Sequence, residues 1–137
     1  MKTIAILTPK IDTFSNPTLT LVFEKLIDEK YKILFFAYEQ LFIPKSIYNK
    51  IECHQLPFNF YKLKKNLTIF KKILKQAYNI YKILRIDNKV NVIICVDPMG
   101  LVIGGRIQRL VKVKIIYASF EIFSEDEFFI QRKKILK

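Results

Sequence analysis

The sequence predicts an α/β fold, in which helices cover both faces of an open, doubly wound parallel sheet. Three observations predict it. The strand-like apolar runs are continuous, segments with helical spacing lie between them, and only 3 of the 137 residues are glycine. Continuous apolar strands are typical of parallel sheets that are buried on both faces. The length is that of one domain, so we expect a single domain over residues 1–137.

The first forty residues read as strand, helix, strand. The run from Lys2 to Thr8 is apolar and is closed by Pro9, which predicts a buried first strand. Apolar residues recur with helical spacing from Thr18 to Lys30, and Asn16 or Thr18 would cap this helix. A second continuous apolar run extends from Tyr31 to Tyr38.

The middle of the chain contains a third strand and the longest helix. Phe42 to Lys50 is ambiguous, whereas Ile51 to Leu56 alternates in polarity and predicts a strand. Helical spacing then extends from Leu67 to Leu84. We expect its core stripe to be Leu67, Phe70, Ile73, Leu74, Ala77, Tyr78, Ile80, Tyr81 and Leu84.

Two more strands follow, with a helix between them. Val90 to Val96 predicts the fourth strand, and Lys112 to Tyr117 predicts the fifth. The helix between them is expected at about Leu101 to Leu110, where Gly104 and Gly105 would allow close packing on the sheet.

Charge and cysteine content limit the function classes. The net charge of +12 favours anionic partners, namely nucleic acid, an anionic membrane surface or phosphorylated substrates. Only four basic residues are arginines, which disfavours sequence-specific nucleic-acid binding because base readout depends on arginine. Two cysteines, Cys53 and Cys95, cannot form a disulfide framework and indicate a reduced, intracellular protein. No apolar run reaches the roughly 18 residues of a transmembrane helix.

Several familiar catalytic motifs are absent from the sequence. The segment from Thr8 to Thr18 has no glycine, so a dinucleotide fingerprint after the first strand is missing, as is a Walker P-loop. The single histidine, His54, follows Cys53 in a predicted strand, where neighbouring side chains point to opposite faces. We therefore expect a core or edge histidine and no metal site, and we expect Cys95 to be a small buried hydrophobe.

Two carboxylates are the candidate catalytic groups. Asp97 and Glu121 follow the fourth and fifth predicted strands. In a parallel sheet these positions face one crevice, where a carboxylate can act as a base or bind a hydroxyl group. The alternatives are that Asp97 caps the next helix and that Glu121 is solvated.

A strongly basic stretch extends from Lys62 to Lys89, with nine basic residues against the single acidic residue Asp87. A basic amphipathic helix can lie on an anionic bilayer. Interleaved aromatic residues and lysines can also hold single-stranded nucleic acid, and an ordinary helix with solvated lysines is the third option. The residues expected to contact a membrane or another anion are Lys64, Lys65, Lys71, Lys72 and Lys75.

Two segments together carry a resemblance to a known family. In VNVIICVDPMGLVIGGRIQRLVKVKIIYASFEIFSE, a strand ends in an Asp-Pro step, a helix with small residues follows, and the next strand leads into YASFEIF at residues 117–123. The opening, KTIAILTPKIDTFSNPTLTLVFEKLIDEKYKILFFAY, has the order strand, loop, helix, strand. In this succession the chain resembles the Rossmann-like amino-terminal domain of GT-B glycosyltransferases, particularly of the family 4 retaining type.

The resemblance implies an activity and a division of labour. The whole protein would move a sugar from a nucleotide-sugar donor to a glycan or lipid-linked acceptor, as in the synthesis of cell-envelope polysaccharides. This chain would supply the acceptor side of the cleft. Thr8, Phe14 and Asn16 would bind the acceptor, and Asp97 and Glu121 would act as the catalytic carboxylates that position its hydroxyl groups.

In the family, a second, carboxyl-terminal domain binds the donor, and this chain does not contain it. We therefore expect the isolated chain to be inactive, to hold no metal or cofactor of its own, and to need the donor-binding domain in cis or as a separate subunit. A helix-like pattern continues to Lys137 without a capping residue, which we interpret as a domain cut before its end.

The chain departs from the family in two places. Phe120 stands where the family often has a histidine, and the loop after the first strand lacks the family's pair of glycines. The predicted location is the cytoplasm, with peripheral contact on the inner face of the membrane. The alternative function is a standalone basic α/β module that binds nucleic acid or an acidic partner.

Overall fold

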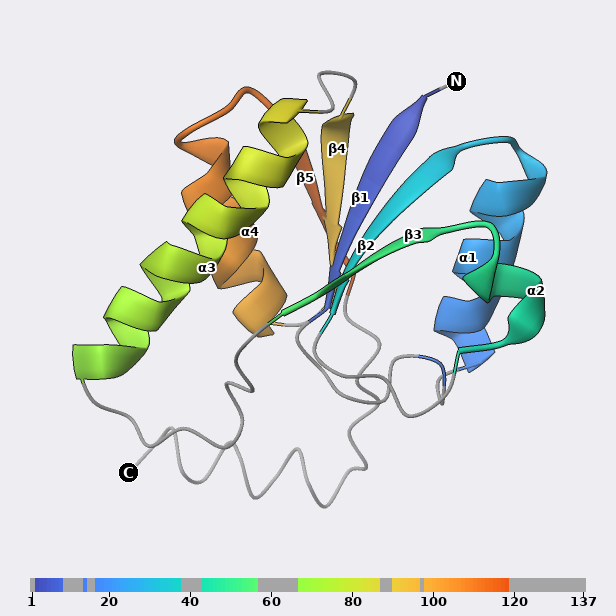
Figure 1. Ribbon diagram of the computed structural model, residues 1–137, viewed down its shortest axis with the longest axis horizontal. Helices are drawn as coiled ribbons and strands as arrows, with labels where there is room; N and C mark the ends of the chain where they lie inside the picture. The colour runs from blue at the N-terminus through green and yellow to red at the C-terminus, as the bar shows by residue number, and fades with distance from the viewer. Residues whose placement is uncertain are drawn as a thin grey trace, which may run out of the picture.

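The computed structural model of the chain describes residues 2–8, 14, 17–37, 43–56, 67–86, 90–96 and 98–118. Strands and helices alternate along these residues, as the sequence predicts (Figure 1). Their bounds are β1 Thr3–Thr8, α1 Pro17–Asp28, β2 Lys32–Ala37, α2 Lys45–Tyr48, β3 Glu52–Gln55, α3 Leu67–Ile86, β4 Val90–Cys95, α4 Pro98–Gln108 and β5 Lys114–Tyr117. The ambiguous segment before β3 contains the short helix α2, and the helix expected after residue 125 lies outside the described residues.

The strands form one parallel sheet in the order β3-β2-β1-β4-β5, which confirms the α/β class and makes the fold Rossmann-like. The central strand β1 pairs on both sides, with Leu7 opposite Phe36 of β2 and Cys95 of β4. All six of its residues are buried, because it has strands on both edges and helices on both faces. The edge strand β3 is mostly exposed, which accounts for its polar residues Glu52, His54 and Gln55.

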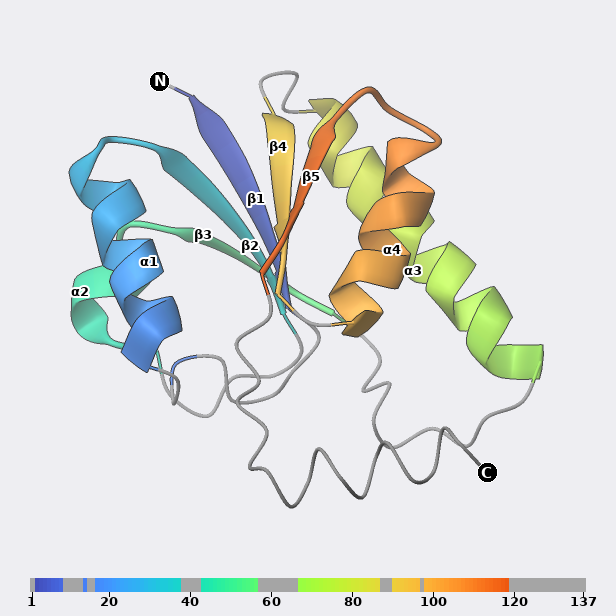
Figure 2. The same ribbon diagram turned by 180° about the vertical axis from the view of Figure 1, so that it is seen from behind.

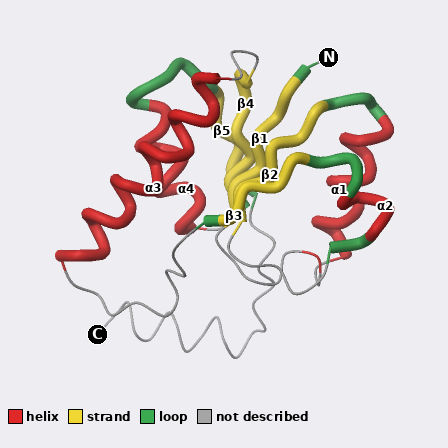
Figure 3. Tube along the Cα trace, viewed as in Figure 1, coloured by secondary structure: helices red, strands yellow, loops and turns green. Residues whose placement is uncertain are grey.

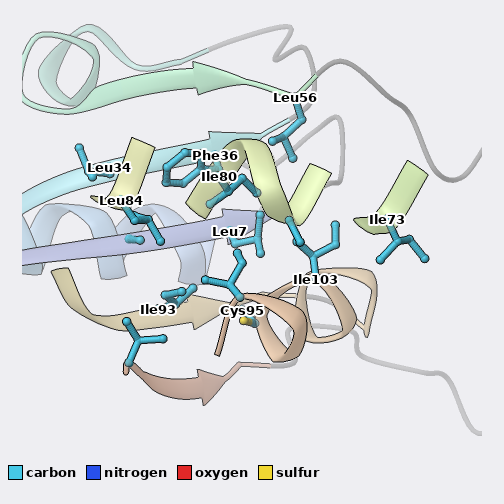
Figure 4. Packing of buried hydrophobic residues seen from close by; sticks show 14 residues of the cluster. Leu7, Leu34, Phe36, Leu56, Ile73, Ile80, Leu84, Ile93, Cys95 and Ile103 are labelled. Carbon is cyan, nitrogen blue, oxygen red and sulfur yellow. The ribbon is translucent and has the colours of Figure 1, made fainter. Parts of the chain in front are cut away.

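Two hydrophobic cores lie on opposite faces of the sheet, because successive strand residues point to opposite faces. Figures 1 and 2 show α1 and α2 on one side of the sheet and α3 and α4 on the other, and Figure 3 shows the same layers. The first core, drawn in Figure 4, includes Ala5, Leu7, Leu34, Phe36, Ile93, Cys95, Ile73, Ala77, Ile80, Leu84, Ile103 and Ile107. The second includes Ile4, Ile6, Ile33, Phe35, Phe14, Leu19, Phe23 and Ile47.

One of the two glycines in α4 is required by close packing, and the other is not. A Cβ atom at Gly104 would lie 2.5 Å from the Sγ atom of Cys95 and 3.3 Å from Cδ1 of Ile115. A Cβ atom at Gly105 would have no neighbour within 4 Å. The prediction of close packing is therefore confirmed for Gly104 and wrong for Gly105. Cys95 is fully buried, as expected.

The core stripe predicted for α3 is too wide. Ile73, Ala77, Ile80 and Leu84 are buried, whereas three members of the predicted stripe are substantially exposed: Phe70 (50%), Leu74 (40%) and Tyr78 (51%). The reason is that α3 packs against the sheet and α4, which cover only one side of a helix. Within the residues described, no helix combines the length and hydrophobicity needed to cross a bilayer.

Candidate functional site

The strands of the sheet are parallel, so their carboxyl ends lie along the same edge of the sheet. Backbone hydrogen bonds extend the strand pairing by one residue at three places. The N–H of Leu56 donates to the carbonyl oxygen of Ala37 (2.7 Å), that of Val96 to Leu7 (3.0 Å) and that of Ala118 to Cys95 (2.8 Å). The chain therefore leaves β3, β4 and β5 in register with the neighbouring strands.

The winding of the sheet reverses between β1 and β4. The connection from β1 passes through α1 to β2, and the connection from β4 passes through α4 to β5, on the opposite side of β1 (Figure 1). Open α/β sheets bind ligands outside the carboxyl ends of their strands at such a reversal. Thr8 ends β1 at this point and Val96 follows β4 beside it, so this edge is the candidate site.

The predicted carboxylate Asp97 comes between two described residues of this edge. Val96 precedes it and is hydrogen-bonded to β1, and Pro98 follows it as the first residue of α4. The amino end of α4 therefore lies at the reversal point, where the positive end of the helix dipole favours an anionic or hydroxyl-bearing ligand. Asp97, Asn16 and Glu121 themselves lie outside the described residues, and their roles stay predictions.

The two described residues of the predicted acceptor-binding set are buried. Thr8 is fully buried and has an interaction partner within the protein. The ring of Phe14 packs 4.9 Å from the ring of Phe23 and 5.6 Å from that of Phe35, measured between centroids. Phe14 thus contributes to the core in which α1 packs on the sheet, through contacts with α1 and β2. Acceptor binding by these residues stays a prediction.

The predicted anion-contacting lysines are only partly described. Lys71 and Lys75 are exposed on α3, whereas Lys72 is half-buried and has a partner within the protein. Lys64 and Lys65 lie outside the described residues.

Sequence reasoning missed a charged cluster beside the edge strand β3. The Nε2 atom of His54 lies 2.8 Å from Oε1 of Glu52, and Nζ of Lys32 lies 3.7 Å from Oε2 of the same carboxylate. The His54 ring also stacks on Phe36, with centroids 5.1 Å apart and planes 17° apart. The signal in the sequence is the spacing of two between Glu52 and His54, which places both side chains on one face of a strand.

This cluster lines a groove of about 480 Å³, together with Leu34, Ile83 and Ile86. Lys32 and Glu52 are the first residues of β2 and β3, so the groove lies toward the amino ends of these strands and apart from the candidate site. His54 is an edge histidine, as expected. No group of three potential metal ligands occurs in the described part of the chain.

The fold is similar to that of a glycosyltransferase from Rickettsia africae ESF-5, with a TM-score of 0.66 and 14% sequence identity. The match covers 96% of this chain and 33% of the glycosyltransferase, so the chain spans about a third of that protein's length. No protein-family model matches the chain. No curated protein sequence matches it either. The similarity thus shows a Rossmann-like fold shared with part of a glycosyltransferase, and the assignment to family 4 stays a prediction.

Proposed function

We propose that this chain is the acceptor-side part of a glycosyltransferase, which moves a sugar from a nucleotide-sugar donor to a glycan or lipid-linked acceptor. The observation that carries the proposal is the structural match, which spans 96% of this chain and one third of a glycosyltransferase. The resemblance of residues 90–125 to the same class of enzyme supports it from the sequence.

The candidate site suggests how the chain would take part in the transfer. The reaction breaks the bond between the sugar C1 atom and the phosphate oxygen and forms a bond from C1 to an acceptor oxygen. The acceptor hydroxyl passes its proton to the departing phosphate oxygen, so the products are the glycosylated acceptor and the free nucleotide. In the proposal, Asp97, which follows Val96 in the chain, and Glu121, which comes four residues after the end of β5, accept hydrogen bonds from acceptor hydroxyl groups and hold them toward the donor.

The donor would be bound by the part of the enzyme that corresponds to the other two thirds of the matched structure. That part is either continuous with this chain in the native protein or a separate subunit. The first measurement is therefore the size of the native protein in its source cells, with an antibody against this segment and an intact mass. A mass far above 16.3 kDa indicates a longer chain, and a mass of 16.3 kDa requires a copurifying subunit.

The activity test uses the native assembly, captured through a tag on this chain. Release of free nucleotide from a panel of nucleotide sugars is measured with and without a membrane extract as the source of acceptor. We expect turnover of at least one donor, and a loss of more than about tenfold in kcat for Asp97→Asn and Glu121→Gln, as for the loss of groups that orient the reacting hydroxyl.

Two exposed carboxylates on α1 provide matched controls. Glu24→Gln and Asp28→Asn should leave the rate unchanged, because α1 covers the face of the sheet opposite α4. A captured assembly that turns over no donor would contradict the proposal. Equal rates in all four variants would contradict the assignment of the two carboxylates.

A further inference from the structure

Positive charge in the described residues is concentrated on one side of the sheet. α3 contains five basic residues and no acidic residue, namely Lys71, Lys72, Lys75, Lys82 and Arg85. The neighbouring helix α4 has Arg106 and no acidic residue. On the opposite side, α1 contains two acidic residues and one lysine. The layer formed by α3 and α4 is therefore the side that attracts an anionic partner.

The same helix exposes a line of apolar side chains. Phe70, Leu74 and Tyr78 are spaced by four residues, so they follow one another along a single side of α3. Each is 40% or more exposed. Val102 of α4, which is also exposed, lies one turn before Arg106, the residue that contacts Phe70. A solvated helix would have polar residues at these positions.

Lysines flank this apolar line on the outer side of the helix. Lys71, Lys75 and Lys82 are exposed, and 100° of rotation per residue places them directly beside the line. We use the name outer face of α3 for these three lysines together with Phe70, Leu74 and Tyr78. Such a combination of a basic side and an adjoining apolar side is typical of helices that lie in a membrane interface.

The contacts of the aromatic rings favour a bilayer over a single-stranded nucleic acid. The Nζ atom of Lys82 lies 4.7 Å from the centroid of the Tyr78 ring, and Cζ of Arg106 lies 5.2 Å from that of Phe70. Nucleic-acid bases bind by stacking on open ring faces, and each of these rings already has a cation over one face. At a bilayer, the rings can enter the headgroup region while the cations contact lipid phosphates.

We propose that the chain docks on an anionic lipid bilayer through the outer face of α3. Phe70, Leu74 and Tyr78 enter the boundary between headgroups and acyl chains, and Lys71, Lys75 and Lys82 contact the phosphates. The docking follows from the charge and exposure of α3 and does not depend on the proposed transferase activity.

The test is cosedimentation of the full chain with vesicles of phosphatidylcholine, with and without 30 mol% phosphatidylglycerol. Binding is expected only with the anionic lipid and should weaken as salt is raised, because the attraction acts within about one Debye length. The triple variant K71Q/K75Q/K82Q should lose about a hundredfold in partition coefficient, at roughly fivefold for each lysine.

A variant with the same net charge separates this face from the charge of the whole chain. K25Q/K45Q/K50Q removes three exposed lysines associated with the α1 and α2 side of the sheet and should reduce binding by less than about fivefold in total. Similar losses in the two triple variants would overturn the proposal. Binding of poly-uridine RNA without binding to vesicles would overturn it as well.

The depth of insertion provides a second readout. L74S/Y78S should weaken vesicle binding, whereas L21S/Y48S removes the same residue types from exposed positions of α1 and α2 and should not. The chain has no tryptophan, so Phe70→Trp is a clean fluorescent reporter, with Tyr48→Trp as its control. We expect a blue shift with anionic vesicles for Phe70→Trp only. No shift at position 70 in a folded variant, checked by circular dichroism, would refute the docking through α3.

Discussion

Two adjacent glycines of α4 allow a direct test of the packing between this helix and the sheet. Gly104→Ala and Gly105→Ala make the same chemical change one residue apart in the interior of the same helix. Alanine in a helix interior is more stabilising than glycine by about 1 kcal/mol, and this gain applies to both variants. They differ in what the added methyl group meets.

At position 104 the new Cβ atom would lie 2.5 Å from Sγ of Cys95 and 3.3 Å from Cδ1 of Ile115. Cys95 is fully buried in the core of the sheet, so its sulfur has no solvent into which it can turn. Overpacking of a core by one methyl group costs about 1–3 kcal/mol. The free energy of unfolding of Gly104→Ala should therefore be about 1–3 kcal/mol lower than that of Gly105→Ala. The free energy of unfolding of Gly105→Ala should be about 1 kcal/mol higher than that of the wild type.

Urea unfolding followed by circular dichroism measures this difference. With an m value of about 2 kcal/mol/M, a difference of 2 kcal/mol separates the two midpoints by about 1 M. The substitution Cys95→Ala removes the clashing sulfur, so adding it to Gly104→Ala should cost less than adding it to the wild type. Equal stabilisation by the two glycine substitutions, or strict additivity in the double variant, would refute the packing derived for Gly104.

Two further predictions concern a buried amide and the two thiols. The Gln76 side chain is buried, and neither its nitrogen nor its oxygen has a hydrogen-bond partner in the described residues, so Gln76→Met should raise the free energy of unfolding by about 1–2 kcal/mol. A lower urea midpoint would show instead that this amide is satisfied. Partial burial raises the pKa of the Cys53 thiol. At pH 8 Cys53 should therefore react with a disulfide reagent more slowly than free cysteine, because less of it is thiolate. The difference between the two reaction rates should narrow as the pH rises through the pKa of Cys53. Cys95 should react only after unfolding, and reaction of both thiols in the native protein would contradict its burial.

The strands were predictable because their signal is local. β1, β2 and β4 begin and end within about one residue of the predicted apolar runs, since strands covered on both faces are mostly apolar along their length. The helical spacing of Phe70, Leu74 and Tyr78 predicts core positions, yet all three side chains are exposed. The spacing of apolar residues identifies which side of a helix faces the core. How much of that side is buried depends on how far the neighbouring sheet and helix extend over it.

The candidate site was predictable to the level of an edge of the sheet. The polar residue Asp97 after the fourth strand, followed by Pro98, indicates a carboxyl end, and in the structure the winding reverses between β1 and β4, the strand that precedes this step. The cluster of Lys32, Glu52 and His54 was not found, because Lys32 is 20 residues from Glu52 in the chain and meets it only through the pairing of β2 with β3.

The sequence by itself determined the alternation of strands and helices, the burial of the sheet on two faces and the excess of positive charge, because each depends on residue type and local spacing. Only the tertiary structure decided that β4 lies beside β1, which brings Thr8 and Val96 together, and that α3 leaves its line of apolar side chains uncovered. These features depend on contacts between residues far apart in the chain. Such contacts are set by the packing of whole layers, about which a local pattern contains no information.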